Sequence, residues 1–298
     1  GQFIFKKHEK DFFRRHMMKV ARFCGIKFLS FSVMGNHYHQ VVKVPARVKL
    51  SDLQLKRRVA DYYGRHSPEY RLLKRASSGN GPDYKAVKEK FLNMIGDVSV
   101  FQKLVKQRFS IWYNDRNNRQ GTLWMGRFKS VLVENNAYAR MCVSAYVDLN
   151  AVRAGIVSNP AAYPHCSYSE ALLGNRSARA GICTVTGFKR WEEASKAYRI
   201  FMSQRGVEKV KSQPAIDRGS LLRELEDKGH LPVADLLHLR LRFFSDGLAV
   251  GRESFLNRVV EELPKRLKPD CLSDSYNLAG GNWNSLKALQ QFRKPVIF

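Results

Sequence analysis

A strand–turn–strand pattern near the amino terminus, FSVMGNHYHQVVKV at residues 31–44, constrains the fold of this chain more than any other feature. Two apolar, β-branched runs flank a Gly-Asn pair, which predicts an antiparallel hairpin. The second run begins with His37 and His39. Alternate side chains of a strand share one face, so both imidazoles are expected to point the same way. Two convergent histidines form half of a divalent-metal site, although such a pair on a polar strand face also arises by chance.

The segments around this hairpin predict the fold class. QFIF at residues 2–5 is typical of the end of a strand, the start of which would precede the sequence. Apolar residues between positions 9 and 25 then recur with helical spacing, and Gly25 is expected to end that helix. Strand, helix and hairpin in this order predict an α+β fold with helices on one face of an antiparallel sheet.

The remaining chain is mostly helical in pattern. The expected elements are helices over about 51–115 with breaks at 77–83 and 96–97, a short strand at 131–133, a helix at 136–155, irregular covering structure at 158–190, and a helix at 191–206. A polar linker is expected at 207–219, followed by a second, all-helical module at 220–298 that weakly resembles a helix-turn-helix. The expected first domain is therefore 1–206, with a helical insertion at about 51–115.

The net charge of the chain limits its partners. Lys and Arg total 52 against 26 Asp and Glu, a formal charge of +26, and residues 1–216 carry +24 of it. Such an excess repels itself in a compact fold unless a polyanion is the usual partner, which favours nucleic acid over an anionic membrane surface. Five scattered cysteines without a C-x-x-C pair favour reduced thiols. With no apolar run of membrane-spanning length, a cytoplasmic protein with no membrane contact is expected.

A helix predicted at 136–155 carries Tyr146 and Asn150, four residues apart and so on one helix face. A nucleophilic tyrosine that attacks a phosphate needs a nearby cation to stabilise the developing charge. Two histidines and the amide oxygen of Asn150 would hold Mg²⁺ or Mn²⁺ and leave positions open for substrate oxygens. Most tyrosines at helical spacing are structural, and Tyr38, Tyr113 and Tyr138 are competing candidates.

At these residues the chain resembles a known family. MGNHYHQVV is similar to the histidine–hydrophobe–histidine signature of HUH single-strand endonucleases in their one-tyrosine (Y1) transposase branch. GTLWMGRFKSVLVE followed by AYVDLNAVRAGIV is similar to the second block of IS200-like and REP-associated tyrosine transposases (RAYT). Together the blocks cover about residues 1–175. One departure is Asn150-Ala151-Val152, where the family usually has asparagine–proline–valine.

The resemblance implies a function and residue roles. It implies a ferredoxin- or RRM-like HUH fold, with Tyr146 as the nucleophile and His37, His39 and Asn150 as ligands of a divalent metal. Tyr146 would cleave single-stranded DNA through a 5′-phosphotyrosine, at hairpin-flanked, REP-like sequences, in DNA transposition by nicking and rejoining. The active site in this family is often completed by dimerisation, so a homodimer remains open. The alternative is a non-catalytic binder of single-stranded or hairpin nucleic acid derived from such a transposase.

Basic and aromatic side chains near the predicted site are candidate DNA contacts. They are Arg127, Lys129, Arg153, Arg108, Lys106 and Trp124. Arg127, Lys129 and Arg153 flank the predicted site and are good phosphate contacts, whereas Lys106 and Arg108 are more often solvated surface charges. An aromatic residue at a helix–strand junction more often belongs to the core.

Overall fold

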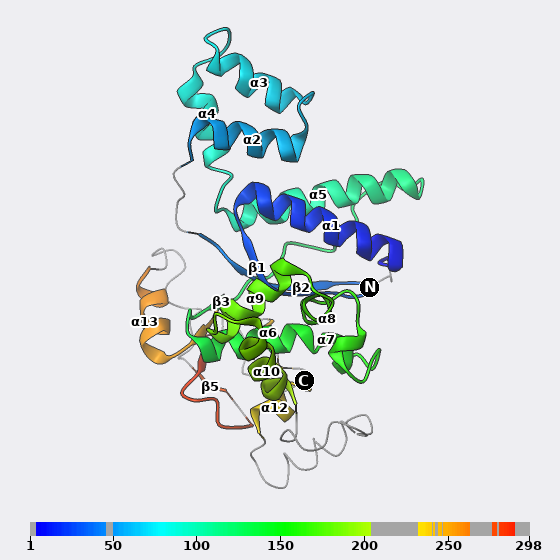
Figure 1. Cartoon of the computed structure of the whole chain (residues 1–298), viewed down its shortest axis with the longest axis vertical. Helices are drawn as coiled ribbons and strands as arrows, with labels where there is room; N and C mark the ends of the chain where they lie inside the picture. Colours follow the sequence, from blue (N-terminus) through cyan, green and yellow to red (C-terminus); the bar gives the residue numbers. More distant parts are fainter. Residues whose placement is uncertain are drawn as a thin grey trace. The chain divides into compact units, whose positions relative to one another are not determined.

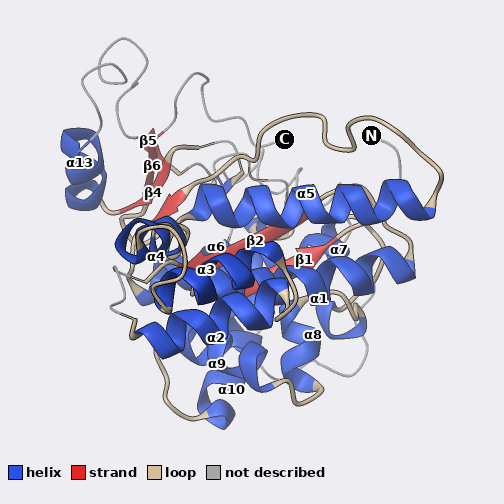
Figure 2. Ribbon diagram, turned by 90° about the horizontal axis from the view of Figure 1, so that it is seen from above, coloured by secondary structure: helices blue, strands red, loops and turns tan. Residues whose placement is uncertain are grey.

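The computed structural model describes residues 4–45, 50–203, 232–239, 241, 244–245, 247–262, 276–278 and 280–289. Within these residues the fold is α+β and mainly helical, with two small sheets (Figures 1 and 2), which confirms the predicted class at that level. No helix in the described part of the chain is long and apolar enough to cross a lipid bilayer.

The chain divides into two compact units that share the hairpin. Unit 1 contains Gly1–Phe28, Val33–His37 and Val42–Phe128, and unit 2 contains Leu29–Ser32, Tyr38–Val41 and Lys129–Phe298. The expected linker at 207–219 lies outside the described residues, so the domain boundary expected there stays a prediction.

The opening of the chain follows the predicted order. Helix α1 (Lys7–Cys24) is followed by strands β1 (Lys27–Val33) and β2 (Tyr38–Lys43), which form a two-stranded sheet. Gly25 ends α1 in the left-handed conformation, with φ 70°, which glycine adopts without steric cost. The Met34 N–H donates to the His37 carbonyl at 2.8 Å and closes the turn between the strands. Ile4 and Phe5 lie outside any strand, so the strand expected at 2–5 is wrong for these two described residues.

Four further helices complete unit 1, as the helical pattern at 51–115 predicted. They are α2 (Asp52–Tyr63), α3 (Pro68–Ser77), α4 (Tyr84–Leu92) and α5 (Val98–Arg116). Ser51 begins α2 with a capping box, and Asp83 and Asp97 cap α4 and α5 through their carboxylates. Aromatic rings join α1 to α5: Phe13 meets Phe109 edge-on at 5.1 Å between ring centroids.

Unit 2 is built around helix α6 (Ala137–Asp148), which continues into α7 (Asn150–Arg153). The next elements are η1 (Pro160–Ala162), α8 (Ser167–Leu172), α9 (Arg176–Thr186) and α10 (Trp191–Met202). The irregular structure expected at 158–190 is therefore wrong. Asn175 caps α9 by accepting from the Ala178 N–H, and Gly187 ends it at φ 84°, so two local signals outweigh the Gly- and Ser-rich composition.

The all-helical module expected at 220–298 is also wrong for the described residues. Helices α12 (Val233–Leu236) and α13 (Glu253–Glu262) are present, but so are strands β4 (Ala249–Gly251), β5 (Tyr276–Asn277) and β6 (Lys287–Leu289). With β3 (Leu132–Val133) they form a sheet in the order β3-β4-β6-β5, in which β3 and β4 are parallel. Strands of two or three residues leave no periodic signal. β3 and β4 pair across more than a hundred residues, whereas β6 pairs with β4 and β5 within the carboxyl-terminal part of the chain.

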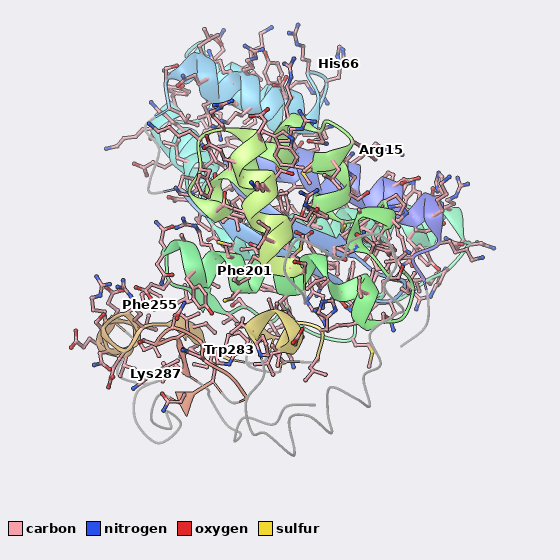
Figure 3. The ribbon with its side chains drawn as sticks, turned by 60° about the horizontal axis from the view of Figure 1, so that its bottom comes forward. Arg15, His66, Phe201, Phe255, Trp283 and Lys287 are labelled. Carbon is pink, nitrogen blue, oxygen red and sulfur yellow. The ribbon has the colours of Figure 1, made fainter. Side chains whose placement is uncertain are left out.

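The second sheet has its own small core and an ion pair. Buried Ala249, Leu256, Val259 and Leu289 form the core, and Phe255 on α13 packs against it (Figure 3). Arg252 donates to both carboxylate oxygens of Glu134, at the end of β3. Burial alone would raise the pKa of Glu134, but the hydrogen bonds and charge of Arg252 outweigh it and lower that pKa.

Candidate active site

Tyr146 lies on α6 beside one of the predicted histidines. The His39 ring, on β2, meets the Tyr146 ring edge-on with 6.5 Å between centroids. Asn136 begins α6 by accepting from the Ala139 N–H at 2.8 Å, and the helix is buried from position 142 onward. The Ser30 hydroxyl donates to the Ser144 carbonyl at 3.2 Å, which holds β1 against α6. The structure thus brings together two sequence motifs that are 107 residues apart.

Arg153, predicted as a DNA contact, lies against Tyr146. Its guanidinium carbon lies 3.8 Å from the Tyr146 ring centroid, a cation–π contact. Nη2 donates to the Tyr146 carbonyl at 2.6 Å and Nη1 to the Leu237 carbonyl at 2.9 Å. Burial lowers the pKa of Arg153 to about 10, which still leaves the side chain positively charged at neutral pH. The cation is therefore fixed against the proposed nucleophile.

The carboxyl-terminal part of unit 2 covers Tyr146, which the sequence patterns did not predict. The Phe244 ring lies 5.2 Å from the Tyr146 ring, and the Trp283 ring lies 5.8 Å from Phe244. Only 5% of Tyr146 is exposed, and Phe244 and Trp283 are buried as well. The Tyr146 side chain is therefore almost entirely enclosed by its neighbours.

Asp148, two residues after the tyrosine, anchors α6 from within. One carboxylate oxygen accepts from the Ser167 hydroxyl at 2.7 Å and the Tyr168 N–H at 3.2 Å, and the other accepts from the Tyr198 hydroxyl at 2.8 Å. Burial raises the pKa of Asp148 to about 6 even though these hydrogen bonds favour the charged form. Sequence reasoning missed this residue. An aspartate inside the apolar run AYVDL was the available signal, because a buried acid needs several donors.

The other predicted metal ligands are placed as follows. His37 immediately precedes β2 and is exposed, whereas Asn150 is the first residue of α7 and only 8% exposed. His37 Nδ1 lies 2.6 Å from Asn36 Oδ1, and a proton on Nδ1 in that hydrogen bond leaves Nε2 in the unprotonated form that binds metals. An amide oxygen suits Mg²⁺ and Mn²⁺, whereas imidazole is the more usual ligand of zinc, copper, iron and nickel. The described residues hold no cluster of three or more His, Cys, Asp or Glu suited to a metal, and the ligand set of His37, His39 and Asn150 stays a prediction.

The remaining predicted DNA contacts divide into exposed and internal positions. Arg127 and Lys129 are exposed. Lys106 donates to the Gly126 carbonyl at 2.7 Å and lies 5.1 Å from the Trp124 ring centroid, while the Trp124 Nε1–H donates to the Ser110 hydroxyl. These contacts fasten the segment after α5 to that helix. They support the structural interpretation of Lys106 and Trp124.

Arg108, the last predicted DNA contact, stacks on two tyrosines of α2. Its guanidinium carbon lies 4.6 Å from the Tyr62 ring centroid and 5.3 Å from that of Tyr63. Among the competing nucleophiles, burial raises the pKa of both Tyr38 and Tyr138 well above the usual value for tyrosine. The neutral phenol is a weak nucleophile, so neither residue gains from its surroundings.

Comparison of the chain with protein-family models, with curated protein sequences and with solved structures finds no significant match. The interpretation of the site therefore depends on the sequence motifs and on the contacts described above.

Proposed function

We propose that this chain is a metal-dependent endonuclease and strand transferase of the one-tyrosine HUH transposase family, acting on single-stranded DNA. The contact between the His39 and Tyr146 rings carries the proposal, because it joins the two motifs on which the resemblance depends. The net charge of +26 supports a nucleic-acid partner. The proposed fold is the ferredoxin- or RRM-like HUH fold, and the hairpin of β1 and β2 supports it.

The proposed reaction exchanges one phosphoester bond for another. The Tyr146 oxygen attacks the phosphorus of a phosphodiester and forms a 5′-phosphotyrosine. The bond to the 3′-oxygen breaks, and that oxygen takes up a proton to replace the one lost by the phenol. Attack by a 3′-hydroxyl on the phosphotyrosine then regenerates Tyr146 and joins the strands. Since no phosphoester bond is lost overall, ATP is not required.

The side chains around Tyr146 have defined roles in this reaction. Arg153 holds the ring in one orientation and keeps a positive charge beside it. His37, His39 and Asn150 would hold Mg²⁺ or Mn²⁺, which when bound stabilises negative charge on the phosphate oxygens. The proposed substrate is hairpin-flanked, REP-like DNA in transposition, and the proposed location is the cytoplasm. A homodimer that completes the site is part of the family's pattern.

Replacement of Tyr146 by Phe tests the proposal. Wild-type protein incubated with labelled hairpin DNA and Mn²⁺ should give a covalent adduct that survives a denaturing gel, and chelation should abolish it. Tyr146→Phe should form no adduct because it lacks the attacking oxygen, yet it should bind the DNA as wild type does. Tyr113→Phe is the matched control and should retain the adduct. An adduct in Tyr146→Phe, or equal adduct with chelator present, would contradict the assignment.

The burial of Tyr146 favours a second candidate function, non-catalytic binding of single-stranded or hairpin nucleic acid. A nucleophile that is 5% exposed and covered by Phe244 is not open to a DNA strand in this conformation. This candidate predicts tight, salt-sensitive binding by wild type without any adduct. The same gel, read beside a binding assay, separates the two functions.

A further inference from the structure

Four aromatic rings of unit 1 stack in a row along the seam between α1 and α5. His8, Phe12 and His16 are spaced four residues apart, which places them on one face of α1. Trp112 of α5 lies against this face, because its ring is 3.8 Å from the Phe12 ring between centroids and within 6° of parallel to it. His8 stacks on Trp112 at 5.5 Å, and His16 stacks on Phe12 at 6.1 Å. We call these four residues the ring row.

The ring row lies outside the core of unit 1. Phe13 and Phe109, the rings that join α1 to α5 within the core, are completely buried. Three members of the row are half-buried, and the His8 side chain is 54% exposed. Among the described residues, Trp112 is the only one whose ring stacks on His8. Since an imidazole ring has two faces, an exposed fraction this large indicates that the second face of His8 is open to a ligand.

Positive charge surrounds the ring row. α1 and α5 together carry ten Lys and Arg against three Asp and Glu. Lys6 and Lys7, which adjoin His8 in the chain, are exposed. At the other end of the row, burial lowers the pKa of His16, and the charges of Arg108 and Lys19 lower it further. Cations therefore flank both ends of the row, which favours a polyanion as the partner.

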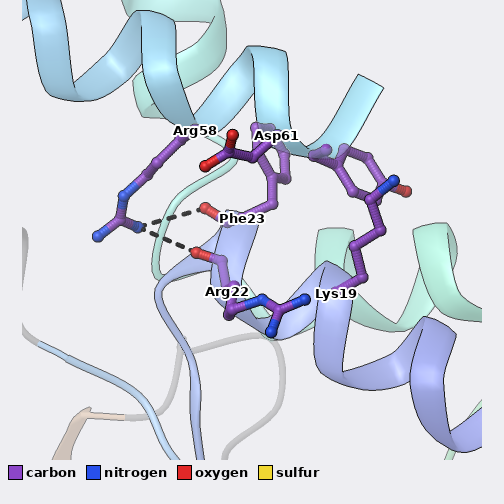
Figure 4. Close-up of a pocket in the computed structure, with 6 residues that line it drawn as sticks. Lys19, Arg22, Phe23, Arg58 and Asp61 are labelled. Atoms are coloured by element: carbon purple, nitrogen blue, oxygen red, sulfur yellow. Dashed lines mark hydrogen bonds between the residues drawn. The ribbon is translucent and has the colours of Figure 1, made fainter. Parts of the chain in front are cut away.

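Two other cations of unit 1 have structural roles instead. Arg58 Nη1 donates to the carbonyls of Arg22 and Phe23 beside a small pocket, and so holds the end of α1 against α2 (Figure 4). Arg108 covers the Tyr62 ring at 4.6 Å. The exposed lysines beside His8 are therefore better candidates for contact with a phosphate than these two arginines are.

We propose that the ring row is a stacking platform for single-stranded nucleic acid. An unpaired base lies on the open face of His8, and Lys6 and Lys7 contact the adjoining phosphates. Unpaired bases stack on aromatic side chains, histidine included, with little dependence on sequence. A lipid surface fits less well, because α1 buries its apolar side chains inside unit 1 rather than presenting them to a bilayer. The inference goes beyond the proposed function and holds whether or not Tyr146 forms an adduct.

Four variants test the platform by binding alone. His8→Ala removes the exposed ring, whereas His8→Phe keeps a ring without an imidazole. His66→Ala is the matched control, because His66 is also exposed in unit 1 but is not part of the ring row (Figure 3). Lys7→Gln removes one charge. Affinities for a labelled single-stranded oligonucleotide, a duplex of the same length and phosphatidylserine vesicles are measured at pH 8 and several salt concentrations.

The two kinds of contact should respond differently. His8→Ala should bind the single strand about tenfold more weakly with an unchanged salt slope, because a base loses its stacking partner while no phosphate contact is removed. It should bind the duplex as wild type does, because paired bases are already stacked on one another. His8→Phe should restore the affinity. Lys7→Gln should reduce the salt slope by about 0.7, the value for one phosphate of a single strand.

The outcomes separate stacking from other contacts. A loss of single-strand affinity in His8→Ala that His8→Phe reverses, with His66→Ala unchanged, supports the proposal. Wild-type affinity of His8→Ala, an equal loss in His66→Ala, or no recovery in His8→Phe overturns it. An equal loss for single strand and duplex assigns His8 to a backbone contact, and a loss for vesicles alone assigns the surface to a membrane. Both of these results also overturn the stacking platform.

Discussion

Replacing Asp148 by Asn should change how the stability of this protein depends on pH. The side chain is fully enclosed by α6, α8 and α10, and its carboxylate accepts from Ser167, Tyr168 and Tyr198. Burial raises its pKa from 3.8 to about 6. The folded protein therefore binds this proton more tightly than the unfolded chain does. Its stabilising contribution is complete below about pH 4 and is lost as the pH rises through 6.

The magnitude follows from the size of the shift. An increase of about two units in the pKa of Asp148, at about 1.4 kcal/mol per unit, lowers the free energy of unfolding by about 3 kcal/mol between pH 4 and pH 7. His238 works in the opposite direction, because burial lowers its pKa from 6.5 to about 4. The stabilising contribution of the neutral His238 is lost as the pH falls from 6.5 toward 4, and this loss is similar in size to the change caused by Asp148. In the wild-type protein the two effects largely cancel, whereas Asp148→Asn leaves the histidine's effect alone.

Urea unfolding followed by circular dichroism at several pH values between 4 and 7 measures this effect. Relative to wild type, Asp148→Asn should gain about 3 kcal/mol in free energy of unfolding from pH 4 to pH 7, because its amide is never charged. Asp115→Asn is the control, since it removes the same charge from an exposed position on α5. A difference between Asp148→Asn and wild type that stays constant with pH would refute this account of the buried carboxyl.

Two further substitutions test other contacts. Phe244→Ala should lower the free energy of unfolding by about 3 kcal/mol, because it removes a buried ring. It should also speed chemical nitration of Tyr146, measured by peptide mass spectrometry, because the removed ring covers the phenol. An unchanged nitration rate would show that the Phe244 ring does not shield Tyr146. Gly25→Ala should lower the free energy of unfolding by about 1–2 kcal/mol, which would appear as a lower urea midpoint. The reason is that φ 70° is strained for alanine and that its Cβ would lie 3.0 Å from Arg58 Nη1. An unchanged midpoint would argue against strain at this turn.

The elements that the sequence predicted well are those with strong local signals. Helix α1, the hairpin and α6 have long periodic patterns with a capping residue or a glycine at one end, and such signals survive in any tertiary setting. The elements missed were α8 and strands β4 to β6, which are short, and α9, whose signals at Asn175 and Gly187 were overlooked in a Gly- and Ser-rich stretch. Residues 249–251 are completely buried beside β3, so their strand conformation depends on a partner that no local pattern contains.

In the candidate site, too, some features follow from the sequence and others depend on the tertiary structure. Its residue types and spacing, H-x-H followed by Y-x-x-x-N, are properties of the sequence. In the structure each pair crosses the end of an element, since His37 precedes β2 and Asn150 begins α7 whereas Tyr146 lies on α6. The partners of Tyr146 depend on folding. The sequence predicted Arg153 as a phosphate contact, and only the structure places it against the Tyr146 ring and the Leu237 carbonyl.

The sequence alone therefore determined helices α1 to α6 and α10, the hairpin, the basic charge and the residue types of the site. Only the tertiary structure decided that His39 meets Tyr146, that Phe244 covers it and that Asp148 is enclosed by three donors. The physical reason is that local structure follows from short-range sterics and hydrogen bonds. Burial, and every contact between distant segments, depends on which surfaces the folded chain packs together.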